Sequence, residues 1–199
     1  MNNHDAVVVI GSSTGGPQTL RAFLAALKSP LPCPLIIVQH MPPKFTWGFA
    51  RGLDRIYCGH VVELQQDEHL TPGTAYVAPG GYRATVCLPG EKPRFRIEPP
   101  SAEDRFAPGI DPMFKSAAER FGRNTLAIIV SGISTGLVID GIEGCRSVKE
   151  RGGAVFVENP DTAVCGGMPR ECLPYSDRTL AGADMAPAVE GWLLGRITS

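Results

Sequence analysis

Three residues that could together carry out nucleophilic catalysis each follow a short apolar run with the composition of a buried strand. Ser13 lies in the glycine-rich segment GSSTGGP, His40 lies in QHMPP, and Asp140 lies in SGISTGLVIDG. In a parallel α/β sheet, functional groups gather beyond the carboxyl ends of the strands, so we expect these side chains to meet there. Acyl transfer needs a nucleophile, a proton shuttle and a group that orients the imidazole. The pattern therefore indicates a serine hydrolase.

Each residue also has an ordinary structural explanation when it is taken alone. The hydroxyl residues of SSTGG could cap the helix expected from Pro17, and Asp140 could cap a helix after Gly141. A lone histidine such as His40 is more often structural than catalytic. A phosphate- or nucleotide-binding turn is a third interpretation, but the GxxxxGK[ST] pattern and the third glycine of GxGxxG are both missing. The joint pattern of three residues favours catalysis.

The elements that must position these residues alternate between strand and helix patterns. Buried strands are expected at 6–10, 35–39, 126–130 and 154–157, with shorter ones at 61–64, 75–77, 84–88 and 94–97. Helices are expected from Pro17, over 45–53, over 111–121 with Asp111 as N-cap and Pro112 at the first position, and over 185–194. This order predicts an α/β fold with a doubly wound, mostly parallel sheet, helices on both faces and an antiparallel hairpin formed by the strands at 84–88 and 94–97. Residues 1–199 are expected to form a single domain.

Composition excludes several classes of protein. The net charge is −1, with 19 Lys and Arg against 20 Asp and Glu, whereas duplex nucleic-acid binders usually carry a basic excess. We expect no nucleic-acid partner and no membrane insertion, because the longest uncharged stretch of interest, 124–139, is too short to span a bilayer. The N-terminus lacks the pattern of a secretion signal, and the six cysteines show no CxxC spacing. These features predict a cytoplasmic protein with reduced cysteines, no metal and no cofactor.

Several segments resemble the catalytic domain of bacterial chemotaxis protein-glutamate methylesterases. They are VVVIGSSTGGP, IIVQHMPPKFTWGFARGLD, TPGTAYVAPGG, GIDPMFKSAAERFG, DGIEG and GGMPREC, and they run in family order. The resemblance implies hydrolysis of glutamate γ-methyl esters on methyl-accepting chemotaxis receptors, with glutamine deamidation as a further activity of many members. It also implies that Ser13 is the nucleophile, His40 the general base and acid, and Asp140 the residue that orients His40. Thr14 would line the site, and the amide of Gly15 would help to hold the oxyanion.

This chain departs from the family pattern in three places. The family reads TGMGxDG around its aspartate, and its methionine amide contributes to the oxyanion hole. The corresponding segment here, 131–141, is longer, and either Ile133 or Leu137 can take the methionine position. The histidine of the family's APGxxH stretch is replaced by Arg83. We expect these 199 residues to hold no receiver domain of the kind found in many members, so separate receiver or signalling proteins would have to supply regulation. A degenerate member that binds a receptor or signalling partner without turnover is the alternative hypothesis.

Overall fold

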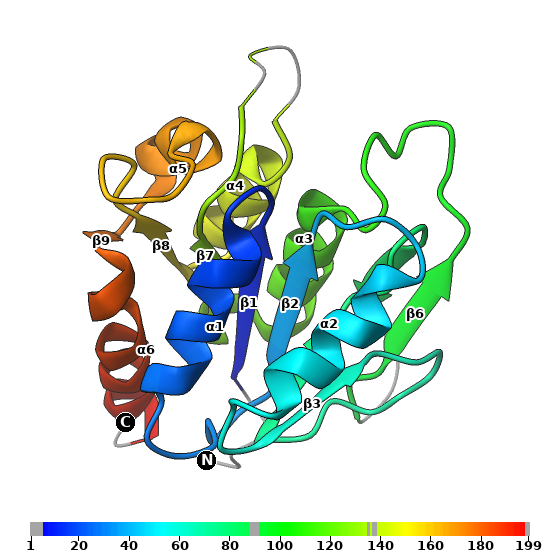
Figure 1. The fold of residues 1–199 in the computed structure, drawn as a ribbon, viewed down its shortest axis with the longest axis horizontal. Helices are drawn as coiled ribbons and strands as arrows, with labels where there is room; N and C mark the ends of the chain where they lie inside the picture. Colours follow the sequence, from blue (N-terminus) through cyan, green and yellow to red (C-terminus); the bar gives the residue numbers. More distant parts are fainter. Residues whose placement is uncertain (1–5, 88–91, 135, 137–138, 198–199) are drawn as a thin grey trace.

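A seven-stranded parallel sheet forms the centre of the protein, whose computed structural model describes residues 6–87, 92–134, 136 and 139–197 (Figure 1). The strand order is β3-β4-β2-β1-β7-β8-β9, so the sheet extends to both sides of β1, with β4 inserted between β2 and the edge strand β3. The strands are β1 (Val7–Ser12), β2 (Leu35–Gln39), β3 (His60–Glu63), β4 (Thr74–Val77), β7 (Thr125–Ile129), β8 (Ala154–Glu158) and β9 (Arg178–Leu180). All six pairings in this sheet are parallel. The doubly wound sheet predicted from the sequence is confirmed.

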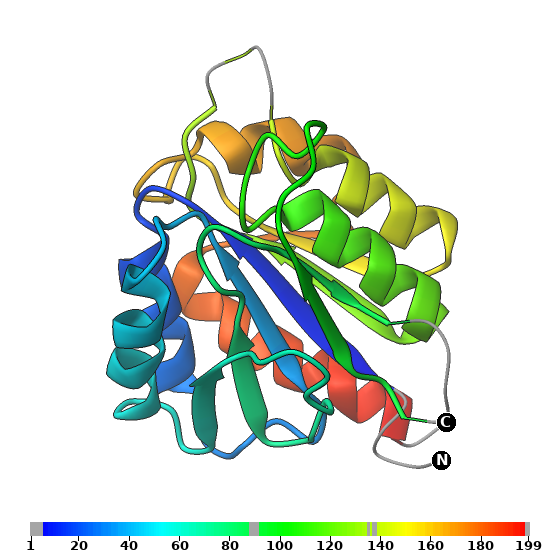
Figure 2. The same ribbon diagram turned by 90° about the vertical axis from the view of Figure 1, so that its right-hand side faces the viewer.

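Helices cover both faces of the sheet because alternate strand residues point in opposite directions. Val8 and Ile10 of β1 pack into one core cluster, and Val7 and Val9 pack into the other. The first face is covered by α1 (Gly16–Ala26), α2 (Phe45–Asp54) and α6 (Gly182–Ile197), and the second by α3 (Ile110–Phe121), α4 (Ile142–Glu150) and α5 (Gly167–Cys172). The turned view in Figure 2 shows the sheet between these two helical layers. Short 3-10 turns at Gly122–Asn124 and Leu173–Tyr175 complete the helical segments.

A separate antiparallel hairpin lies over the second face. It consists of β5 (Arg83–Val86) and β6 (Phe95–Glu98), as expected from the two middle-section runs. The Ser116 hydroxyl of α3 accepts a hydrogen bond from the Val86 amide at 3.0 Å, which fixes the hairpin to the helix. The hairpin therefore packs against α3, whose N-terminus lies at the candidate site.

The expected beginning of α3 is wrong. The helix starts at Ile110 with Gly109 as N-cap, so Asp111 lies inside the first turn instead of capping it. The amides of Ile110 and Asp111 donate instead to Asp140, a residue distant in sequence, so no local pattern predicts this cap. The strand β9 and the short α5 were not predicted either. In the part of the chain that the structure describes, no helix combines the length and the apolar character needed to cross a membrane.

Candidate active site

The segments that carry the predicted site residues meet at the carboxyl end of the sheet. Ser13 follows β1 and His40 follows β2, and these two strands are neighbours. The His40 amide donates to the Ser12 carbonyl at 3.0 Å. The Gln39 side-chain amide donates to the carbonyls of both Ser13, at 2.9 Å, and His40, at 3.1 Å. One buried side chain thus ties the backbone of the serine turn to the backbone of the histidine.

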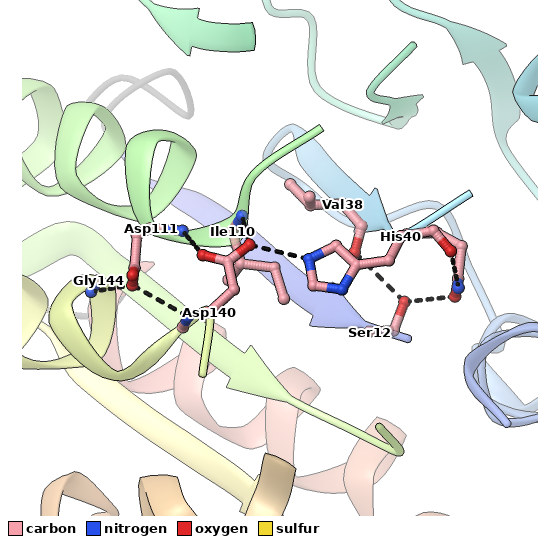
Figure 3. A network of polar contacts seen from close by, with 9 residues as sticks. Ser12, Val38, His40, Ile110, Asp111, Asp140 and Gly144 are labelled. Atoms are coloured by element: carbon pink, nitrogen blue, oxygen red, sulfur yellow. Dashed lines mark hydrogen bonds and ion pairs between the residues drawn. The ribbon is translucent and has the colours of Figure 1, made fainter. Parts of the chain in front are cut away.

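Asp140 receives three hydrogen bonds, and His40 donates one of them (Figure 3). Its Oδ2 atom accepts from His40 Nε2 at 2.8 Å and from the Ile110 amide at 2.6 Å, while Oδ1 accepts from the Asp111 amide at 2.8 Å. The amides belong to the first turn of α3, whose partial positive charge favours a carboxylate there. Asp140 therefore holds the imidazole and caps α3. The alternative that it caps its own helix is wrong, since the N-cap of α4 is Gly141 without a side-chain hydrogen bond.

Asp111 makes the reciprocal contact. Its Oδ1 atom accepts from the amides of Gly141, at 3.0 Å, and Gly144, at 2.6 Å, in the first turn of α4. Each of the two aspartates thus caps the helix of the other. Burial and the nearby charge of Asp140 raise the pKa of Asp111 from its ordinary value of 3.8 to about 6. A negative Asp111 beside a negative Asp140 is therefore a more costly state than either charge alone.

Phe106 lies flat on the imidazole of His40. The ring centroids are 4.4 Å apart and the planes differ by 6°. Phe106 comes from the segment between β6 and α3, so the contact depends on tertiary folding and has no signature in the sequence. Asp140 fixes the ring through an edge nitrogen, and Phe106 restricts rotation out of its plane. His40 is consequently held by two independent contacts.

Ser12 and Ser13 occupy different environments although they are adjacent. The Ser12 side chain is buried, and its hydroxyl donates to Gln39 Oε1 at 2.8 Å, with the Val38 carbonyl at 3.3 Å. Ser13 is half-buried, and its hydroxyl makes no hydrogen bond to any described residue, His40 included. Neither serine caps α1, whose N-cap is Gly15 without a side-chain hydrogen bond. Ser13 is the serine with an unengaged, accessible hydroxyl.

Ser131, which the sequence did not single out, connects the serine turn to two other strand ends. Its carbonyl accepts from the Ser13 amide at 2.9 Å, and its hydroxyl donates to the Thr14 carbonyl and accepts from the Cys165 amide, both at 2.8 Å. Its own amide donates to Glu158 Oε2 at 2.8 Å. Glu158 is buried, which raises the pKa of its carboxyl. Ser131 therefore fixes the turn that presents Ser13.

Backbone amides near Ser13 are available to an anion. Among the described residues, no carbonyl or side chain accepts a hydrogen bond from the amides of Thr14, Gly15 or Ile133. Gly15 precedes α1 with φ +83°, and a Cβ there would come within 2.3 Å of Ser131 Oγ. Ile133 follows Gly132, whose amide donates to the Cys165 carbonyl at 2.9 Å. Leu137, the other predicted oxyanion residue, lies outside the described residues.

A polar cleft of about 420 Å³ borders the aspartate side of the site. Phe106 and Asp140 line it, together with Arg83 and Lys115. Arg83 takes the place of the histidine in the family's APGxxH stretch, and it forms an ion pair with Asp104. Neither Ser13 nor His40 lines this cleft, so it lies beside the aspartates and does not reach the imidazole.

Comparison with known proteins gives consistent matches. The family model described as CheB methylesterase matches residues 8–189. A protein-glutamate methylesterase/protein-glutamine glutaminase of Myxococcus xanthus is 37% identical over 92% of this chain and 52% of its own length. One of a Nocardioides species is 41% identical over 92% of this chain and 49% of its own length. The chain thus spans about half the length of the curated relatives it matches.

A solved structure is similar over nearly its whole length. The crystal structure of the Thermotoga maritima CheB methylesterase catalytic domain superposes with a TM-score of 0.86 at 34% sequence identity, covering 92% of this chain and 96% of that one. The match includes the strands that carry the candidate site, since the family model extends from β1 to α6. The chain belongs to the CheB methylesterase family.

Proposed function

We propose that this chain hydrolyses glutamate γ-methyl esters on the cytoplasmic segments of chemoreceptors, with Ser13, His40 and Asp140 as its catalytic residues. The observation that carries the proposal is the bond from His40 Nε2 to an aspartate that is itself fixed by two helix amides. Two curated relatives of this chain are named protein-glutamate methylesterase/protein-glutamine glutaminase, so deamidation of receptor glutamines is part of the proposal.

In this proposal the two nitrogens of His40 have different roles, because a carboxylate can only accept a hydrogen bond. Nε2 carries the proton donated to Asp140, so Nδ1 is the nitrogen that can accept a proton. In the proposed reaction Ser13 Oγ attacks the ester carbonyl while its proton passes to Nδ1. The imidazolium then returns that proton to the leaving methoxide, which departs as methanol. Water activated by the same nitrogen releases the glutamate carboxylate and restores Ser13.

Amides of the serine turn would stabilise the charge that develops on the ester oxygen. Thr14 and Gly15 lie at the N-terminus of α1, where the helix dipole also favours an anion. Ile133 supplies a third free amide from the β7–α4 segment, and Leu137 remains the alternative predicted for that role. The proposed chemistry therefore uses side chains and amides of this chain alone.

The test measures methanol released from methylated cytoplasmic fragments of receptors. Parent protein, Ser13→Ala and Ser12→Ala would be compared, each also treated with a fluorophosphonate probe whose attachment site is mapped by mass spectrometry. We expect labelling of Ser13 and methanol release by the parent, loss of both in Ser13→Ala, and retained labelling in Ser12→Ala. Binding to receptor fragments without labelling or methanol release would instead favour a non-catalytic binding protein.

A further inference from the structure

We propose that the exposed side of α2, with Arg21 of α1, is a docking surface for an anionic helical segment of the protein substrate. This α2 face consists of Arg21, Lys44, Phe45, Trp47, Arg51 and Arg55. The inference rests on the proposed function for the identity of the partner, and adds a recognition surface outside the catalytic residues. Figure 1 shows α1 and α2 on the same side of the sheet, with α2 following the strand that leads to His40.

The cations of the α2 face make no ion pair within the described part of the chain. None of Arg21, Lys44, Arg51 and Arg55 forms an ion pair with a described residue. Other cations do: Arg83, Arg96, Arg146, Lys149, Arg151 and Arg170. The acid of α2, Asp54, accepts a hydrogen bond from the Val61 amide at 2.8 Å. This surface is therefore positive although the chain as a whole has a net charge of −1.

The same cations are close to one another. Arg21 Nη2 lies 3.0 Å from the point that a Cβ of Gly52 would occupy, so this guanidinium crosses from α1 onto α2. Arg51 and Arg55 are four residues apart, a spacing at which like charges repel on a helix. The dipole at the end of α2 favours Arg51 and Arg55 but does not account for Arg21. An anionic partner would relieve this repulsion.

Large apolar side chains accompany the charges. Phe45 is 65% exposed and Trp47 is 56% exposed, and the Arg51 guanidinium lies 4.9 Å from the centroid of the Trp47 ring. Trp and Arg are the residue types that most often anchor protein interfaces. Phe45 begins α2 only a few residues after His40, so a segment seated on this face would continue toward the catalytic histidine.

The chemistry of the reaction determines the charge of the partner. Hydrolysis of a glutamate ester and deamidation of a glutamine both leave a carboxylate, so each turnover adds one negative charge to the substrate segment. The α2 face would hold the processed segment more tightly than the unprocessed one. The enzyme would consequently stay on a segment after the first hydrolysis.

The test measures binding by Ser13→Ala protein, so it does not depend on turnover. The probes are soluble receptor cytoplasmic fragments from the same organism, carrying either glutamine or glutamate at every methylation position. At low salt we expect tighter binding of the glutamate form. Arg21→Glu/Arg51→Glu should abolish that preference and weaken binding about 10-fold, and Trp47→Ala should weaken binding of both forms. The matched control is Lys92→Glu/Arg94→Glu, which makes the same change of charge on exposed hairpin residues and should retain binding.

Three results would overturn the inference: equal binding of both fragments, equal loss in the control, or binding of Ser13→Ala protein to anionic phospholipid vesicles but not to the fragments. Fluorophosphonate labelling of proteins that retain Ser13 distinguishes a failure of the docking inference from a failure of the proposed function. If the parent is not labelled, the proposed catalysis fails while the binding results still apply. The Arg21→Glu/Arg51→Glu substitutions are therefore also made in protein that keeps Ser13. If this variant is labelled to the same extent as the parent, its catalytic site is intact, and the loss of fragment binding comes from the α2 face.

Discussion

Replacing Asp140 with asparagine should damage both the fold and the proposed catalysis, because its carboxylate accepts three hydrogen bonds from donors that cannot all be satisfied by an amide. The donors are His40 Nε2 and the amides of Ile110 and Asp111. An asparagine presents one oxygen and one NH₂ group. If the NH₂ takes the place of Oδ1 it faces the Asp111 amide, and if it takes the place of Oδ2 it faces Ile110 and His40. At least one donor loses its acceptor in either orientation.

The expected loss of stability follows from the number of donors left without an acceptor. One buried donor left without an acceptor costs about 1–3 kcal/mol, and the bonds that remain lose their charge-assisted strength. We expect the free energy of unfolding of Asp140→Asn to fall by about 2–4 kcal/mol. The rate should fall by about 10³-fold or more, because an asparagine NH₂ that faces Nε2 favours the imidazole tautomer with the proton on Nδ1, which cannot accept from Ser13.

His40→Gln separates the two effects. Its amide can still donate to Asp140, and the carboxylate keeps both helix amides, so we expect the same loss of activity with a change in unfolding free energy below about 1 kcal/mol. Urea denaturation at pH 7.5 and methanol release from a receptor fragment measure the two quantities. The reasoning is refuted if Asp140→Asn unfolds at the parental urea concentration, or if it retains activity within 10-fold of the parent.

Three further perturbations test other parts of the site. Phe106→Ala removes the ring stacked on His40 and should lower kcat about 10-fold with little change in KM. Phe106→Tyr keeps a stacked ring and should have the parental kcat. Equal kcat for the parent and both variants would argue against a positioning role for Phe106. Gly15→Ala should lose labelling of Ser13 and destabilise the fold by more than about 2 kcal/mol, because φ +83° is unfavourable for alanine and the added Cβ would meet Ser131 Oγ. Gly136→Ala is the control, with φ +77° and open space around the Cβ, so only the backbone effect should remain. For Asp111, a carboxyl whose pKa is raised from 3.8 to about 6 binds more protons in the folded state, so the free energy of unfolding should fall as pH rises from about 4 to 6. Asp111→Asn keeps the Oδ1 acceptor and should flatten that fall in urea titrations, and an unchanged pH dependence would assign it to another group.

The sheet and most helices could be predicted from the sequence because their signals are local. Apolar β-branched runs identified β1, β2 and β7, and the hairpin followed from turn residues between two short runs. The three-residue strand β9 was missed because two of its three side chains are exposed, so it has no apolar run. Its place in the sheet comes from pairing with β8, which is a tertiary property.

The sequence pointed to the residues of the candidate site, whose catalytic roles stay a prediction, but it did not point to the residues that hold them in place. Ser13, His40 and Asp140 are polar residues after strands, and this position drew attention to them. Phe106 and Ser131 act through contacts with segments distant in sequence, so nothing in their immediate neighbourhood distinguishes them from ordinary loop residues. Asp111 matched the local signature of an N-cap, but the first turn of α3 receives its cap from Asp140 instead.

The reciprocal caps also explain how Asp140 can contact His40 despite the long segment before it. A lengthened loop would displace Asp140 if the loop determined its position. The position is instead fixed from the other side, by the amides of Ile110 and Asp111 and by the hydrogen bonds from Gly141 and Gly144 to Asp111. These contacts lock the N-termini of α3 and α4 together as one unit. Changes of length between Ser131 and Asp140 therefore need not move the aspartate from its place against His40.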